Sequence, residues 1–149
     1  MSTKIKKDDR FICDMLGIKL RHNNIKYKYG KENKRMDCTT RAISRVLNLP
    51  YDDVQKMQFE LGLKYNYMPN YIPIIEMILI NYYGYTEIKA KRTYVGKFMY
   101  EHKTGRYVIS AAGHMIAYIN GTWYDNDHCL KYPDEFLVKR INKVYYKEK

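Results

Sequence analysis

Apolar residues recur every three or four positions in several segments of the first hundred residues, which is the spacing of an α-helix. The clearest segment is 38–48, where Ala42, Ile43 and Val46 repeat along one side and Pro50 stops the pattern. We therefore predict a helix over residues 38–48. The same spacing predicts further helices over residues 11–20, 52–61, 71–83 and 94–101.

The period of the pattern changes to two in other segments, which is typical of half-buried β-strands. The predicted strands cover residues 86–91, 106–111, 114–119, 122–125 and 140–146. Asn120 and Gly121 separate two of these strands, and this dipeptide is the strongest short signal for a two-residue hairpin turn. We therefore expect segments 114–119 and 122–125 to pair as an antiparallel hairpin.

The order of the predicted elements, helices first and antiparallel strands afterwards, is typical of the α+β class. We expect one domain over residues 1–149, with N-terminal helices packed on a C-terminal antiparallel sheet and residues 1–10 as a flexible arm. A chain of 149 residues buries roughly two thirds of the surface that it exposes when unfolded. It therefore needs neither disulfides nor a metal ion to fold.

The chain carries 27 Lys and Arg residues against 16 Asp and Glu residues, a formal net charge of +11. Such a surface attracts acidic proteins and nucleic acid. A low-GC genome offers a simpler origin, because Lys, Asn, Ile and Tyr are all abundant here and all have A/T-rich codons. No segment approaches the ~18 apolar residues of a membrane span, and we recognise no signal peptide. We therefore expect a cytoplasmic protein with no membrane partner.

The three cysteines, Cys13, Cys38 and Cys129, are odd in number and form no Cys-x-x-Cys pair. This pattern disfavours a disulfide scaffold and a structural zinc site, and it favours a reducing compartment. His128 beside Cys129 matches no common zinc spacing, so we expect no metal ion and no cofactor. An unpaired cysteine in such a compartment can instead be a nucleophile.

Cys38 lies at the first position of the predicted helix 38–48, and Asp37 occupies its N-cap position. Backbone N–H groups and the helix dipole stabilise a thiolate at such a place. The negative charge of Asp37 opposes the same ionisation. An inert cysteine at the start of a helix is the alternative interpretation.

A two-residue turn fixes which positions of the predicted hairpin face each other. His114 then faces Asp127, and Ile116 faces Asp125. Because side chains alternate along a strand, His114 shares one face with both carboxylates. Asp127 lies directly opposite the imidazole, and Asp125 lies on the diagonal, roughly 7 Å away between Cβ atoms. Either carboxylate could orient the imidazole and stabilise its protonated form.

Three segments carry a resemblance to a known family. These are DCTTRAI at 37–43, opening a helix, GHMIAY at 113–118, and WYD at 123–125 after the Asn-Gly turn. In this order they resemble the papain-like cysteine peptidase superfamily over residues 37–127. The chain is most similar to small bacterial and phage members, and more distantly to bacteriocin leader-processing peptidases.

The resemblance implies a papain-like fold and a peptidase or isopeptidase-like activity on a peptide or protein substrate. It implies that Cys38 is the nucleophile and that His114 is the general base and later the general acid. It also implies that Asp125, rather than Asp127, orients the imidazole.

The sequence departs from that family at one functional position. Such peptidases carry a glutamine a few residues before the cysteine as a donor to the oxyanion, whereas residues 31–35 read Lys-Glu-Asn-Lys-Arg. Asn33 could supply this donor, with the backbone N–H of Cys38 as the second.

Two alternatives to a hydrolase therefore stand. One is a catalytically inactive papain-like module, phage- or plasmid-encoded, that binds a host protein or nucleic acid through its basic surface. The other is an acyltransferase or transglutaminase-type enzyme with the same triad.

Overall fold

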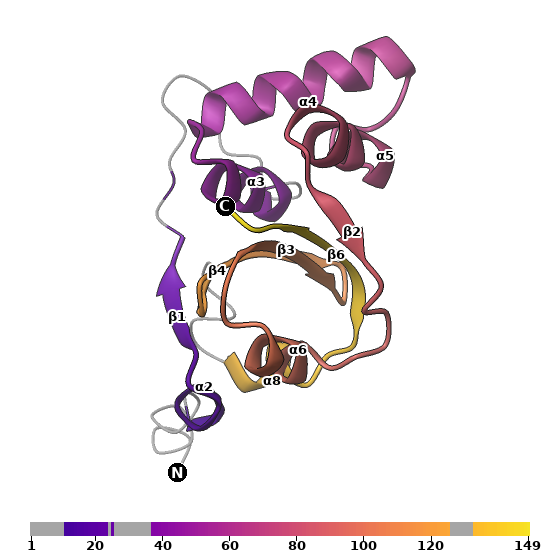
Figure 1. Cartoon of the computed structure of the whole chain (residues 1–149). Helices are drawn as coiled ribbons and strands as arrows, with labels where there is room; N and C mark the ends of the chain where they lie inside the picture. The colour runs from indigo at the N-terminus through magenta and orange to yellow at the C-terminus, as the bar shows by residue number, and fades with distance from the viewer. Residues whose placement is uncertain (1–10, 24, 26–36, 126–132) are drawn as a thin grey trace.

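The computed structural model describes residues 11–23, 25, 37–125 and 133–149 (Figure 1). The helices of these residues are α2 (Phe11–Leu16), α3 (Asp37–Leu47), α4 (Tyr51–Tyr65), α5 (Ile72–Glu76), the π-helix η1 (Met77–Tyr82), α6 (Val95–Glu101) and α8 (Pro133–Leu137). The strands are β1 (Lys19–His22), β2 (Thr86–Ile88), β3 (Arg106–Ala111), β4 (His114–Ile119), β5 (Thr122–Asp125) and β6 (Ile141–Lys147).

Six strands of the described residues form one mixed sheet in the order β1-β5-β4-β3-β6-β2. The pair β1 and β5 is parallel, and every other neighbouring pair is antiparallel. The prediction of a wholly antiparallel sheet is therefore wrong at one edge. The sequence gives no sign of β1, because only Leu20 of this strand is buried and the other three residues are exposed.

Helices cover both faces of the sheet. Figure 1 shows α3, α4 and α5 on one face and α2, α6 and α8 on the other. Along β4, Ile116 and Tyr118 belong to the core on the side of α6, whereas Met115 and Ala117 belong to the core under α3. The α+β class is confirmed. The prediction of N-terminal helices packed on the sheet describes only the face that α3, α4 and α5 cover. On the opposite face lie α6 and α8, which follow those helices in the chain.

The hairpin of β4 and β5 has the predicted register. Ile119 lies opposite Thr122 across a turn made by Asn120 and Gly121. Both turn residues have positive φ angles, 47° and 85°, which Asn and Gly adopt most easily. This register brings the end of β5 beside the beginning of β4.

A second two-residue turn, Ala112 and Gly113, joins β3 to β4 immediately before His114. Its φ angles are 51° and 73°. Ala111 pairs with His114 across this turn, so β4 begins at the histidine itself. A left-handed alanine is uncommon, because its Cβ crowds the following carbonyl oxygen.

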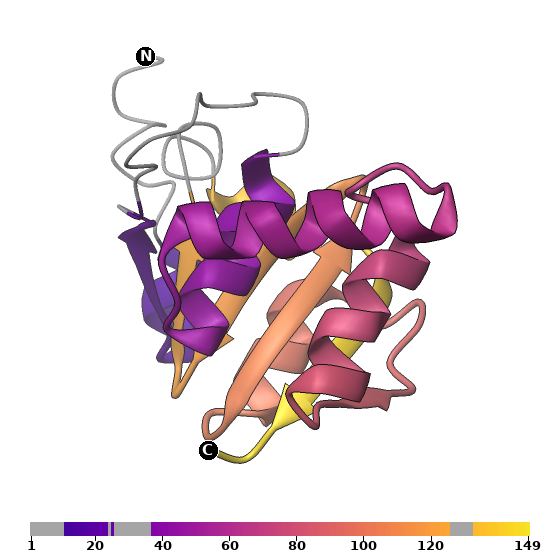
Figure 2. The same ribbon diagram turned by 90° about the horizontal axis from the view of Figure 1, so that it is seen from above.

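Helix α4 continues past Gly62, although the sequence predicts an end there. It ends at Asn66, whose φ of 59° is left-handed and whose N–H donates to the carbonyl oxygen of Gly62. A Cβ at position 62 would lie 2.7 Å from the carbonyl oxygen of Tyr67. Gly62 is therefore required by the chain that folds back on the helix. Figure 2 shows α4 lying across α3 and α5.

The predicted third helix consists of α5 followed by the π-helix η1. Ile74, Ile78 and Leu79 are fully buried on its inner side, whereas Tyr82 at its end is exposed. This helical segment thus covers the sheet on one side and faces solvent on the other. No helix of the described residues is long and apolar enough to cross a membrane.

Candidate active site

Cys38 is held at the beginning of α3. The helix begins at Asp37, one residue before the predicted start, so Cys38 is its second residue. Ala42, Ile43 and Val46 are buried beneath the helix, which packs on β4. The N–H groups in the first turn of a helix have no partner within the helix, and the positive end of the dipole lies there. The thiol therefore projects from a place that favours negative charge.

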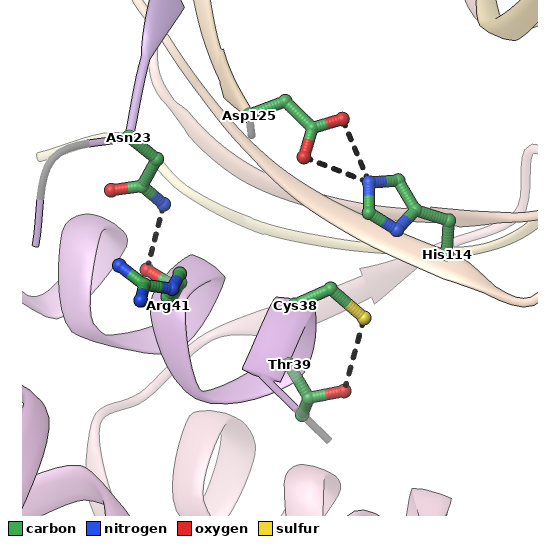
Figure 3. Close-up of polar contacts among 6 residues, drawn as sticks. All are labelled: Asn23, Cys38, Thr39, Arg41, His114 and Asp125. Carbon is green, nitrogen blue, oxygen red and sulfur yellow. Dashed lines mark hydrogen bonds and ion pairs between the residues drawn. The ribbon is translucent and has the colours of Figure 1, made fainter. Parts of the chain in front are cut away.

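His114 and Asp125 face each other across the hairpin. His114 is the first residue of β4, and Asp125 is the last residue of β5. The imidazole Nε2 lies 2.8 Å from Oδ1 and 2.7 Å from Oδ2 of the carboxylate (Figure 3). Asp125 is 3% exposed, whereas the side chain of His114 is 32% exposed. The predicted diagonal contact between these two residues is therefore present.

The thiol of Cys38 lies on the other side of the same imidazole. In Figure 3 the second ring nitrogen, Nδ1, points toward the sulfur. Burial raises the pKa of the thiol, but a hydrogen bond with His114 and the charge of the imidazolium lower it. The backbone of Met115 and the hydroxyl of Thr39 add further hydrogen bonds that lower it. The net thiol pKa lies below its ordinary value, which favours a thiolate–imidazolium pair.

Aromatic rings support the imidazole from the side of α8. The ring of Phe136 meets that of His114 edge to face, with centroids 5.7 Å apart and planes at 89°. Trp123 in turn stacks on Phe136 at 5.5 Å, and both rings are buried. This packing restricts rotation of the imidazole. Phe136 could not be assigned to the site from the sequence, because α8 is too short to show a helical period.

Asn23, directly after β1, ties the end of β5 to α3. Its backbone N–H donates to the carbonyl oxygen of Asp125 at 2.8 Å. Its side-chain amide donates to the carbonyl oxygen of Arg41 at 3.1 Å (Figure 3), and its Oδ1 accepts from Nε of Arg45 at 3.3 Å. The side chain is buried, so these bonds hold the two halves of the site in place. Asn23 could not be assigned to the site from the sequence, since its position depends on the parallel pairing of β1 with β5.

The remaining predicted site residues, Asn33 and Asp127, lie outside the described residues. The backbone N–H of Cys38 belongs to the first turn of α3, where it can donate to an anionic oxygen formed beside the thiol. Within the described part of the chain, no three side chains of His, Cys, Asp or Glu gather closely enough to hold a metal ion.

Comparison with known proteins adds no relative to this picture. No protein-family model, no curated protein and no solved structure matches the chain. What the site can do follows from its own geometry. A thiol at a helix start, an imidazole and a buried carboxylate together supply a nucleophile, a proton carrier and a group that orients it.

Proposed function

We propose that this protein is a cysteine hydrolase that cleaves a peptide, isopeptide or related amide bond, with Cys38, His114 and Asp125 as its catalytic triad. One observation carries the proposal. The imidazole of His114 is hydrogen-bonded to a buried carboxylate at 2.7 Å and lowers the pKa of the Cys38 thiol on its other side. A thiol activated in this way is nucleophilic near neutral pH.

The reaction begins when the thiolate of Cys38 attacks the carbonyl carbon, which forms a C–S bond and an oxyanion. The N–H groups at the start of α3 stabilise this oxyanion. The imidazolium of His114 protonates the leaving amine as the C–N bond breaks, and a thioester remains. His114, now neutral, takes a proton from the water that attacks the thioester. The acid product leaves, and the thiolate–imidazolium pair is restored.

Asp125 acts on the imidazole throughout this cycle. Its carboxylate accepts a hydrogen bond from Nε2–H, so Nδ1 is the nitrogen that exchanges a proton with the thiol and the substrate. Because Asp125 is buried, its charge acts on the imidazolium with little screening by water. The carboxylate itself does not need to take up the proton.

The fold that fits this assignment is papain-like, and we include it in the proposal. The nucleophile begins a helix that packs on the sheet, the base begins a strand, and the orienting carboxylate ends the next strand. The chain order Cys, His, Asp is the order that the resemblance implies. The mixed sheet with helices on both faces supports the broader α+β class.

A second candidate function is binding of an acidic protein or nucleic acid by a catalytically inactive module. The net charge of +11 favours it, as does the absence of glutamine from residues 31–35. Binding of this kind weakens steeply with salt and is unchanged by Cys38→Ala. Hydrolysis, in contrast, is abolished by Cys38→Ala and by His114→Ala.

The alkylation rate of each cysteine, measured against pH by peptide mass spectrometry, tests the proposal. We expect iodoacetamide to modify Cys38 at about pH 6 at least about tenfold faster than it modifies N-acetylcysteine. His114→Ala should remove this advantage. His102→Ala is the matched control, because His102 stacks on Phe98 and is not among the groups that shift the pKa of Cys38.

A Cys38 that titrates like an ordinary thiol, near ~8.5, would refute the triad and leave the binding function. If Cys38 is activated, a library of peptide and isopeptide substrates follows, with circular dichroism to show that Cys38→Ala is folded. Undiminished cleavage by folded Cys38→Ala would show that another residue is the nucleophile.

A further inference from the structure

A basic cavity lies at the opposite end of β3 from His114. Its volume is about 500 Å³. Arg106, the first residue of β3, lines the cavity, whereas the last residue of the strand pairs with His114. The strand length places about 17 Å between the two ends. The cavity is therefore separate from the candidate active site.

The cavity wall combines four cationic side chains with three aromatic ones. These residues are Arg45, Arg106, Lys147, Lys149, Tyr83, Tyr85 and Tyr124. None of the described residues in the wall is Asp or Glu. A concave wall with charges of one sign focuses the electric field and concentrates anions.

Arg106 is held firmly at the C-terminal end of α3. Its Nε donates to the carbonyl oxygen of Val46 at 2.9 Å, and its Nη2 lies 3.4 Å from that of Arg45. The hydroxyl of Tyr85 also donates to the carbonyl oxygen of Val46, at 3.2 Å. The negative end of the helix dipole is thus already compensated, so it does not cancel the positive charge of the cavity.

The other cations are placed around this arginine. Lys147 pairs with Arg106 across β3 and β6, and its Nζ donates to the carbonyl oxygen of Tyr83 at 2.8 Å. The guanidinium of Arg45 lies over the ring of Tyr124, 4.6 Å from its centroid. Cations that are fixed before a ligand arrives lose little entropy when it binds.

We propose that this cavity binds a small polyphosphate-bearing molecule of nucleotide size, with its phosphate groups against Arg106, Lys147 and Lys149. Several cationic side chains, with no Asp or Glu side chain among the described residues of the wall, suit a ligand that carries several negative charges. Guanidinium and ammonium groups are the usual partners of phosphate. The volume lies within the range of about 300–1,000 Å³ that is typical of small-molecule sites, and it exceeds what a lone phosphate ion fills.

Thermal unfolding and isothermal titration with inorganic tripolyphosphate, ADP and adenosine test the proposal. We expect ADP and tripolyphosphate to bind and to raise the unfolding temperature, and adenosine to do neither. Binding should weaken as salt is added. The double variant Lys147→Ala/Lys149→Ala should weaken ADP binding at least about tenfold, because it removes two of the phosphate contacts.

The matched control is Lys89→Ala/Lys91→Ala, which removes the same charge from two exposed lysines outside the cavity. It should change the affinity for ADP by less than about twofold. An equal loss in both double variants, or no binding of either polyphosphate, would overturn the proposal. It would also be overturned if a single-stranded oligonucleotide bound far more tightly than ADP, which would indicate a nucleic-acid site. None of these measurements depends on Cys38, so they are independent of the hydrolase proposal.

Discussion

Asp125→Asn is the substitution that most directly tests how the site is activated. It keeps the shape of the side chain and removes one buried negative charge. Nε2 of His114 lies within 2.8 Å of both carboxylate oxygens, but this nitrogen carries a single proton. The pair therefore counts as one charge-assisted hydrogen bond shared between two oxygens, and such a bond contributes about 1.5–3 kcal/mol.

Loss of that contribution destabilises the imidazolium relative to the neutral imidazole. Because the thiolate of Cys38 is favoured by the imidazolium, the fraction of thiolate falls with it. A loss of about 1.5–3 kcal/mol lowers the equilibrium constant between the ion pair and the neutral pair by about 10- to 150-fold. We expect the alkylation rate of Cys38 at about pH 6 to fall severalfold, and by that full factor where the ion pair is the minor form.

The control for this measurement is Asp53→Asn, which removes an exposed charge from the first turn of α4. Its alkylation rate should match that of the wild type. A folded Asp125→Asn variant whose rate stays within about twofold of the wild type would refute the reasoning, because the buried charge would then not sustain the ion pair. Equal decreases in both variants would refute it as well.

Three further predictions concern stability. The pKa of the Cys38 thiol is lower in the folded state than in the unfolded state, where it is about 8.5. The thiolate therefore stabilises the fold fully above the unfolded-state pKa, and this stabilisation is lost as the pH falls through the folded-state pKa. Urea titrations should show the difference between wild type and Cys38→Ser shrinking toward acid pH, and a constant difference would contradict this. Asn23→Ala removes one buried and one partly buried hydrogen bond and should cost about 1–3 kcal/mol in thermal unfolding, while the exposed Asn142→Ala should cost almost nothing. Ala112→Asn replaces an alanine whose φ is left-handed with a residue that adopts this conformation more easily. It should raise the free energy of unfolding by up to about 1 kcal/mol and leave the alkylation rate of Cys38 unchanged. A less stable variant would argue against strain at this turn.

The strands around the site could be predicted because their signals are local. Strands β3, β4 and β5 have the predicted bounds, and the Asn120-Gly121 turn fixes the hairpin register. The predicted register places Asp125 and Asp127 on the same face as His114, so it permits the contact of His114 with Asp125 but does not select it. The preference for Asp125 over Asp127 came from the resemblance to a family rather than from the residues.

The parts that could not be predicted depend on contacts between distant segments. Strand β1 has one buried side chain, so nothing in its sequence separates it from a loop. Asn23 acquires its role only when β1 pairs with β5, and Phe136 acquires its role only when α8 packs beside the hairpin. The basic cavity, too, joins the end of α3 to the end of β6, which are far apart in the chain.

The parallel pair at the sheet edge also constrains the order in which the protein can fold. Lys19 pairs with Thr122, about a hundred residues later in the chain, whereas the hairpin of β4 and β5 joins neighbouring segments. Contacts between distant residues form slowly, because a long loop must first be closed. During synthesis β1 leaves the ribosome well before its partner, so it waits unpaired. Until it docks, β5 is an open edge, and Asn23 is not yet bonded to Asp125. The reactivity of Cys38 during refolding would therefore report the docking of β1 on β5.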